Sequence, residues 1–155
     1  MKNISKDVPL AEITLRKYEK PSSKDRRDNV RKACLSLGLL QPGDSRDIIV
    51  DILYILLEAR VKKRKMSVEE IQQEITSFRK KRKLSTKGVA LSNIRRQLLR
   101  LRNISLVEKA KNRYRISEFS SLKEIFSERI KKYLLDSIVS RIEEQLFMLD
   151  SEFSE

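Results

Sequence analysis

Side chains that bind phosphates and nucleic-acid bases are concentrated in one stretch of the sequence. Between Arg79 and Arg115 the chain has fourteen Lys or Arg residues and a single acidic residue, Glu108. This stretch carries the whole net charge of +13, because bases and acids cancel over the rest of the chain. Such a surplus of positive charge on one part of a protein favours a polyanionic partner. We therefore expect a nucleic acid as the partner.

The composition excludes several kinds of chemistry. The 155-residue chain has no His and one Cys, Cys34, which excludes His-based catalytic triads, the usual zinc sites and disulfides within the chain. Cys34 has apolar neighbours at helical spacing, so we interpret it as a core residue. We expect no enzyme activity, no cofactor and no metal. The apolar runs are too short for a membrane span and the N-terminus lacks a signal-peptide core, so we expect a cytoplasmic, nucleoid-associated protein.

Apolar spacing and capping signals predict the elements that position these side chains. The sequences Ser67-Val-Glu-Glu70 and Ser121-Leu-Lys-Glu124 are typical of a capping box at a helix start. Segment 46–60 is apolar on nearly all sides, which favours a central helix over the alternative, a buried strand. Lys111-Asn112 suits a tight hairpin turn, because Asn tolerates a positive φ. The predicted elements are helices 26–37, 46–60, 68–78, 89–103 and 121–149, a short strand at about 63–66 and a hairpin at 105–117.

With this order of elements, residues 46–117 resemble the winged helix-turn-helix family. The resemblance rests on three segments: Ser67-Val-Glu-Glu-Ile71, Asn93-Ile-Arg-Arg-Gln-Leu-Leu-Arg-Leu101, and Asn103 to Ile116. They match the start of the second helix, the recognition helix, and the exit with its wing. The resemblance implies a mainly α fold with a small β-hairpin wing (α+β). The turn over 79–88 departs from the family, in which about three or four residues are usual.

The chain divides into three parts on this interpretation. Residues 1–43 form an N-terminal arm and helix, residues 44–117 the winged helix-turn-helix domain, and residues 118–155 a C-terminal amphipathic helix. A recognition helix presents its N-terminal residues to base edges in the major groove, where Arg and Asn can each bond a base at two points. The expected base-reading residues are Ser92, Asn93, Arg95 and Arg96. The expected DNA-backbone contacts are Arg79, Lys80, Lys81, Arg82, Lys83, Lys87 and Arg100. The expected wing contacts are Lys109, Lys111, Asn112, Arg113 and Arg115.

An apolar stripe runs along the C-terminal helix. Apolar residues recur every four positions from Leu122 to Leu146. The stripe is too long to be covered by a domain of this size, and left open it would exceed the apolar patches that monomers usually show. We expect Leu122 to Ile130 to fold back on the chain and the far part to join a homodimer, by helix packing rather than an extended coiled coil. The predicted dimerisation residues are Leu134, Ile138, Ile142, Leu146 and Leu149.

These features predict a sequence-specific double-stranded DNA-binding protein, a transcription regulator acting as a homodimer with no metal or membrane partner. The alternative is an architectural or replication- and partition-associated DNA-binding protein with low sequence specificity. A winged helix used only for protein contacts would not need this concentration of charge. RNA binding is less favoured, because the sequence offers no pair of exposed aromatic residues as a stacking platform.

Overall fold

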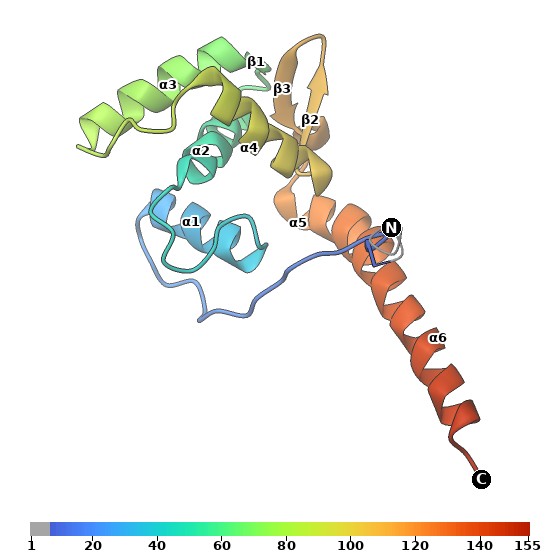
Figure 1. Ribbon diagram of the computed structural model, residues 1–155. Coiled ribbons are helices and arrows are strands. Elements are labelled where there is room, and N and C mark those ends of the chain that lie inside the picture. Colours follow the sequence, from blue (N-terminus) through green and yellow to red (C-terminus); the bar gives the residue numbers. More distant parts are fainter. Residues whose placement is uncertain (1–6) are drawn as a thin grey trace.

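The computed structural model describes residues 7–155. It is mainly helical with one small antiparallel sheet (Figure 1), which confirms the α+β class predicted from the sequence. The helices and strands are α1 (Arg26–Ser36), α2 (Ile48–Val61), β1 (Met66–Ser67), α3 (Val68–Lys81), α4 (Leu91–Asn103), β2 (Val107–Ala110), β3 (Arg113–Ile116), α5 (Leu122–Ile125) and α6 (Asp136–Glu152). A 3₁₀ turn, η2 (Ser117–Phe119), follows β3, and a π-helical segment, η3 (Phe126–Leu135), joins α5 to α6.

Helix α2 is the centre of the core. Nine of its residues are buried, and α1, α3, α4 and β3 all pack against it. The long apolar run is therefore the predicted central helix and not a strand. A single apolar core joins Cys34 of α1 with Leu56 of α2, Ile71 of α3 and Leu98 of α4. Helix α1 thus belongs to the same packed body as the predicted domain over 44–117, and Cys34 is confirmed as a core residue.

The segment before α1 is extended and is fixed at Arg16. Its backbone N–H donates to the carbonyl of Ser36 at 2.9 Å, and its Nη1 donates to the carbonyl of Leu35 at 3.2 Å. These bonds satisfy carbonyls at the end of α1 that lack partners within the helix. Gly38 follows with a φ of +72°, and a Cβ there would lie 2.5 Å from the Thr14 oxygen, so the turn requires glycine. Residues 1–6 of the predicted arm lie outside the described residues.

The sheet has the strand order β1-β3-β2 and is antiparallel. Lys111 and Asn112 join β2 to β3 with φ angles of 52° and 62°, as a two-residue type I′ turn requires. The predicted hairpin turn is therefore confirmed. Tyr114 and Ile116 of β3 are buried, whereas Arg113 and Arg115, which alternate with them, are not.

Three element boundaries differ from the sequence predictions. The strand near 63–66 is instead Met66–Ser67, because Lys63 turns the chain after α2 with a φ of 51°. Helix α3 starts at the predicted capping box but continues past residue 78 to Lys81, because the side chain of Arg79 is held in the interior. Helix α4 starts two residues later than predicted, since Ala90 has extended backbone angles (φ −62°, ψ 144°) and forms the N-cap.

The C-terminal segment is helical from Leu122 to Glu152, but it is not the uniform α-helix predicted over 121–149. The π-helical segment η3 interrupts it. Ile125 and Ile130 are buried and lie five residues apart, which matches the five-residue repeat of π-helical hydrogen bonds. Helix α6 has no buried residue over its whole length, Asp136–Glu152, and projects away from the body (Figure 1). Among residues 7–155, no helix combines the length and the apolar character that a membrane crossing needs.

Candidate nucleic-acid interface

Helix α4 exposes its polar side because its apolar side is held in the core. Ile94, Leu98 and Leu101 are fully buried, and the helix packs against α2, α3 and β2. No acidic residue occurs between Leu91 and Asn103. The exposed side carries three of the predicted base-reading residues, Ser92, Arg95 and Arg96. These side chains can therefore reach a ligand without any change in the helix.

The fourth predicted base-reading residue, Asn93, forms hydrogen bonds within the chain. Its Nδ2 donates to the carbonyl of Gly88 at 2.7 Å, and its Oδ1 accepts from Nε2 of Gln97 at 3.2 Å. Reading adenine at two points would need both ends of the amide. In this structure the amide of Asn93 fastens the first turn of α4 to the preceding loop, and its predicted base-reading role stays a prediction.

The loop over 82–90 is longer than the family resemblance implies, but it is anchored along its length. Nε of Arg79 donates to the carbonyl of Ser85, and Nε2 of Gln72 donates to the carbonyl of Val89 at 2.9 Å. Together with the bond from Asn93, three side chains hold backbone carbonyls of this loop. The start of α4 is thus fixed to α3 by hydrogen bonds to the loop that joins them.

Arg79 belongs to a buried ion-pair network and not to the exposed surface. It pairs with Asp51, and its Nη1 lies 3.2 Å from Oδ1 of Asp47. Arg27 of α1 reaches the same carboxylates, with 2.9 Å to each. Burial alone would lower the pKa of Arg27, but the hydrogen bonds and charges of Asp51 and Asp47 outweigh it and raise that pKa. The assignment of Arg79 as a phosphate contact is therefore corrected, because the residue is only 4% exposed and its guanidinium bonds Asp47, Asp51 and the carbonyl of Ser85.

The rest of the basic run is divided between exposed and engaged side chains. Arg82 lies over the ring of Phe78, 4.8 Å from its centroid, and pairs with Asp25 at 3.5 Å. Lys80, Lys81 and Lys83 are exposed and have no ion-pair partner within residues 7–155. Lys80 and Lys81 lie in the last turn of α3 and not in a turn as predicted, because the buried Arg79 extends that helix. The three lysines remain candidates for contacts to phosphates.

A basic hollow lies beside α4. Its volume is about 480 Å³, and it lies between α4 and the segment that leads into α2. Four basic side chains line it: Arg46, Lys87, Arg96 and Arg100. Asp44 is the one acidic residue of the lining, and Nη1 of Arg100 bonds Oε1 of Gln97 at 2.9 Å. The hollow therefore offers a surplus of positive charge next to the exposed side of the helix.

The predicted wing residues also divide into side chains that form ion pairs and side chains that are exposed without one. Arg113 pairs with Glu70 at 3.0 Å, and Arg115 pairs with Glu108. The hydrogen bond from the backbone of Ser67, with the charge of Arg113, holds the pKa of Glu70 below its usual range. Two wing lysines, Lys109 and Lys111, are exposed near the tip of the hairpin. Asn112 shapes the turn, so among the predicted wing residues only the lysines bring uncompensated charge to the hairpin.

No protein-family model, curated protein or solved structure matches this chain. The candidate interface is therefore defined by its own geometry. Ser92, Arg95 and Arg96 lie on one helix, and the basic hollow adds Arg46, which the sequence interpretation missed. Arg46 stands outside the basic stretch and between Asp44 and Asp47, so its sequence context gives no signal of a basic surface.

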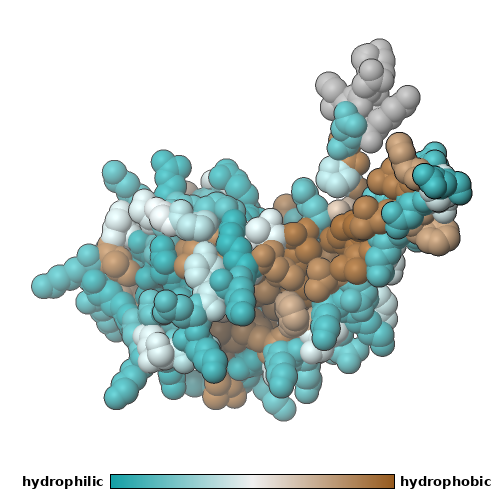
Figure 2. All heavy atoms as spheres, turned by 90° about the horizontal axis from the view of Figure 1, so that it is seen from below, coloured by the Kyte–Doolittle hydropathy of each residue, from teal (hydrophilic) through white to brown (hydrophobic). Residues whose placement is uncertain are grey.

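The predicted dimerisation residues lie along one exposed side of the C-terminal helix. Leu134 and Ile138 are half-buried, whereas Ile142, Leu146 and Leu149 are 47%, 54% and 48% exposed. Figure 2 shows an apolar band that continues from the body along the projecting part of the molecule. Much apolar surface thus remains uncovered within this chain.

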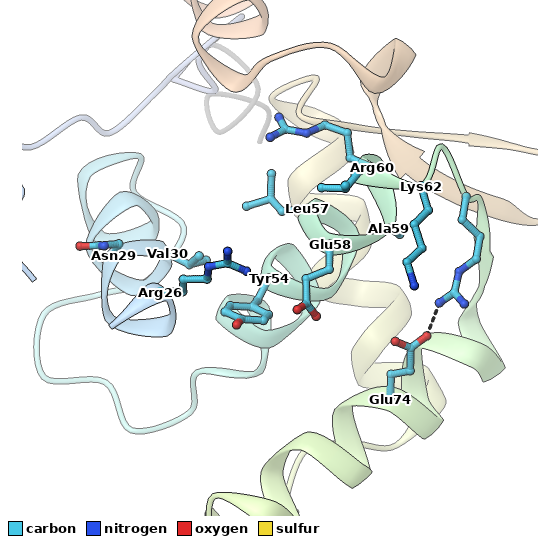
Figure 3. Close-up of a pocket in the computed structure, with 12 residues that line it drawn as sticks. Arg26, Asn29, Val30, Tyr54, Leu57, Glu58, Ala59, Arg60, Lys62 and Glu74 are labelled. Carbon is cyan, nitrogen blue, oxygen red and sulfur yellow. Dashed lines mark hydrogen bonds and ion pairs between the residues drawn. The ribbon is translucent and has the colours of Figure 1, made fainter. Parts of the chain in front are cut away.

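A second hollow, of about 690 Å³, opens among α1, α2 and α3 (Figure 3). Arg26, Tyr54 and Glu58 line it from α1 and α2, and the ion pair between Arg64 and Glu74 closes one side. Its lining mixes acidic, basic and apolar groups, so it does not extend the basic surface. Within residues 7–155, no cluster of three or more acidic or thiol side chains is placed to hold a metal ion.

Proposed function

We propose that this chain is a sequence-specific double-stranded DNA-binding protein of the winged helix-turn-helix type, with α4 as its recognition helix in the major groove. The observation that carries the proposal is the exposed side of α4, with Ser92, Arg95 and Arg96 on a helix that has no acidic residue. The element order α2-β1-α3-α4-β2-β3 supports it, because it is the order that the family resemblance implies.

The proposed contacts to bases and the proposed contacts to phosphates use different side chains. Arg95 and Arg96 can each present two donors to the acceptor pair of guanine, and Ser92 can bond either a donor or an acceptor. Contacts to phosphates carry no sequence information but fix the orientation of the protein on the duplex. The side chains suited to phosphates are Arg46, Lys80, Lys81, Lys83, Lys87, Arg100, Lys109 and Lys111.

Salt dependence of affinity tests the proposal. If about six phosphates are neutralised, log K falls with log salt concentration at a slope near −5, at about 0.9 per phosphate. Fluorescence anisotropy with a labelled duplex, between roughly 50 and 200 mM salt, measures this slope. Lys123 is exposed on α5 and belongs to none of the proposed DNA contacts. The variant Lys123→Ala should therefore keep the wild-type salt slope and serves as the control. An affinity that ignores salt would refute DNA binding through a basic surface.

A second candidate is an architectural DNA-binding protein with little sequence preference. The exposed Lys80, Lys81 and Lys83 favour it, because flexible ammonium groups bind phosphates without reading bases. Selection of bound sequences from random DNA separates the two functions. A transcription regulator enriches one motif, whereas an architectural protein enriches none.

The proposed regulator acts as a homodimer. The exposed Ile142, Leu146 and Leu149 support this, because they form apolar surface that a second copy would cover. Replacing both Ile138 and Ile142 with Asp leaves the core intact, since neither is buried. Sedimentation should give a dimer for the wild type and a monomer for this variant. A wild type that is monomeric at micromolar concentration, or a variant that stays dimeric, would contradict the proposed dimer.

A further inference from the structure

The uncovered apolar residues of the C-terminal helix have a different spacing from the stripe as a whole. The four-residue repeat that begins at Leu122 includes residues that fold back on the core, up to Ile130. Among the uncovered apolar side chains, one set recurs at alternating steps of four and three residues: Leu135, Val139, Ile142, Leu146, Leu149 and Phe153. This is the a/d pattern of a heptad repeat, which is typical of coiled coils. Tyr133, Phe147 and Met148 are also exposed but lie outside this set.

We propose that residues 135–153 form a parallel, two-stranded coiled coil with a second copy of this chain. The inference deepens the proposed homodimer and rests on it, but it replaces the helix packing expected from the four-residue repeat. Five of the six a/d side chains are at least 44% exposed, and Leu135 is half-buried at the start of the repeat. A self-complementary seam of this kind is covered most directly by an identical seam.

The charges beside the seam fix the orientation. Asp136, Glu143 and Asp150 lie seven residues apart and occupy one flank, the e positions. In an antiparallel pair the two e flanks face each other, so acidic rows would meet, and like charges across an interface oppose that pairing.

In a parallel pair the same acidic residues face the opposite flank of the second copy. The g positions within the coil are Ile138, Gln145 and Glu152. Ile138 and Gln145 would face Glu143 and Asp150 of the second copy, and neither Ile138 nor Gln145 carries a charge. The charge pattern therefore opposes the antiparallel pairing, whereas the parallel pairing brings no acidic rows together.

A parallel coil has a consequence for the whole assembly. Its two-fold axis runs along the coil, so both DNA-binding bodies lie at the same end. An antiparallel coil would instead separate the bodies along its length, which is about 28 Å for nineteen residues at about 1.5 Å per residue. Two bodies at one end can present both α4 helices to one side of a duplex, at half-sites arranged as an inverted repeat.

Disulfide trapping of the full-length protein tests the orientation without DNA. Two variants, Val139→Cys and Leu149→Cys, each place one thiol in the seam. In a parallel coil each residue faces its own copy, so each variant should cross-link to itself on mild oxidation, with most of the protein migrating as a dimer. The matched control is Ser137→Cys, an exposed position on the outer side of the helix, which should remain largely uncross-linked.

The native thiol does not interfere with this test. Cys34 is fully buried, and burial raises the pKa of its thiol to about 12, so the wild type should give no cross-link. None of the three substituted positions is buried within its own chain, so the fold of each body should be unchanged in the variants.

Three results would overturn the parallel coil. If only a mixture of Val139→Cys and Leu149→Cys cross-links, the helices are antiparallel, because that pairing brings residue 139 opposite residue 149. If no variant cross-links and sedimentation gives a monomer, there is no coil. If sedimentation gives a trimer or tetramer, the coil is not two-stranded. Each result leaves the salt test of DNA binding unaffected, so a failure of the coil and a failure of the DNA-binding function can be told apart.

Discussion

The last turn of α3 and the exposed side of α4 are both rich in basic residues, but their arginines have different roles. Arg79 is buried and holds Asp47 and Asp51, whereas Arg95 and Arg96 are exposed and have no ion-pair partner within residues 7–155. The difference arises from what each side chain faces: Asp51 and Asp47 lie against Arg79, whereas Arg95 and Arg96 lie on the exposed side of α4, away from its buried residues. An arginine in a basic stretch can therefore stabilise the fold or serve a ligand, according to the residues that face it.

The largest effect is expected where the buried network is broken. Asp51→Ala removes the fully buried one of the two carboxylates that Arg27 and Arg79 share, and breaking a buried pair in this way typically costs about 3–5 kcal/mol. The free energy of unfolding from urea titration measures this loss. Lys81→Ala, two residues beyond Arg79 and exposed, is the matched control and should change stability by less than about 0.5 kcal/mol. If both variants lose the same free energy of unfolding, the buried network does not stabilise the fold more than an exposed lysine does.

The next largest effect is on the affinity for DNA, and the free energy of unfolding should not change. Arg95→Ala or Arg96→Ala should weaken binding to a selected site by about 1–3 kcal/mol, the value of a two-point contact with guanine. Binding to random DNA should weaken much less, so the ratio of the two affinities falls. Competition titrations on both duplexes measure this ratio. If the ratio stays at the wild-type value, these arginines do not read bases.

A smaller and uniform effect is expected from the exposed lysines. Lys81→Ala or Lys111→Ala should weaken binding to selected and random duplexes alike and reduce the salt slope by about 0.9 for each lost phosphate contact. The salt titration described above measures both changes. A loss confined to the selected duplex would place the lysine with the base-reading residues.

The smallest effect concerns the acid stability of the buried network. Burial alone would raise the pKa of Asp47, but hydrogen bonds and charges from Arg27 and Arg79 outweigh it and lower that pKa below its ordinary value of 3.8. A lowered pKa in the folded state stabilises the protein above that ordinary value, and the contribution is lost as the pH falls through the folded-state pKa. Unfolding of Asp47→Asn should therefore depend less on pH below about 4 than unfolding of the wild type. Parallel pH profiles would contradict this coupling.

The sequence predicted most of the fold because its signals are local. The capping box at Ser67, the turn at Lys111-Asn112 and the apolar segment of α2 each specify structure within a few residues. The π-helical segment was not predictable from periodicity. Apolar residues recur every four positions from Leu122, as in an α-helix, and this pattern does not single out Ile125 and Ile130, the buried pair that lies five residues apart.

The candidate site was only partly predictable, because its residues depend on distant partners. Ser92, Arg95 and Arg96 follow from the buried side of their own helix. The roles of Arg79 and Asn93 depend on Asp51 and on the carbonyl of Gly88, and a sequence pattern does not reveal such pairings.

The central claim, that the exposed side of α4 lies against DNA bases, can be tested by site-specific cross-linking. A photoreactive group attached through Ser92→Cys would lie on that side of the helix, and the buried Cys34 would not take the label. Irradiation of the complex should cross-link this position to bases of a selected duplex, whereas the same group attached through Lys123→Cys on α5 should give no cross-link. Equal cross-linking from both positions, or none from residue 92 in a complex that forms, would contradict the claim.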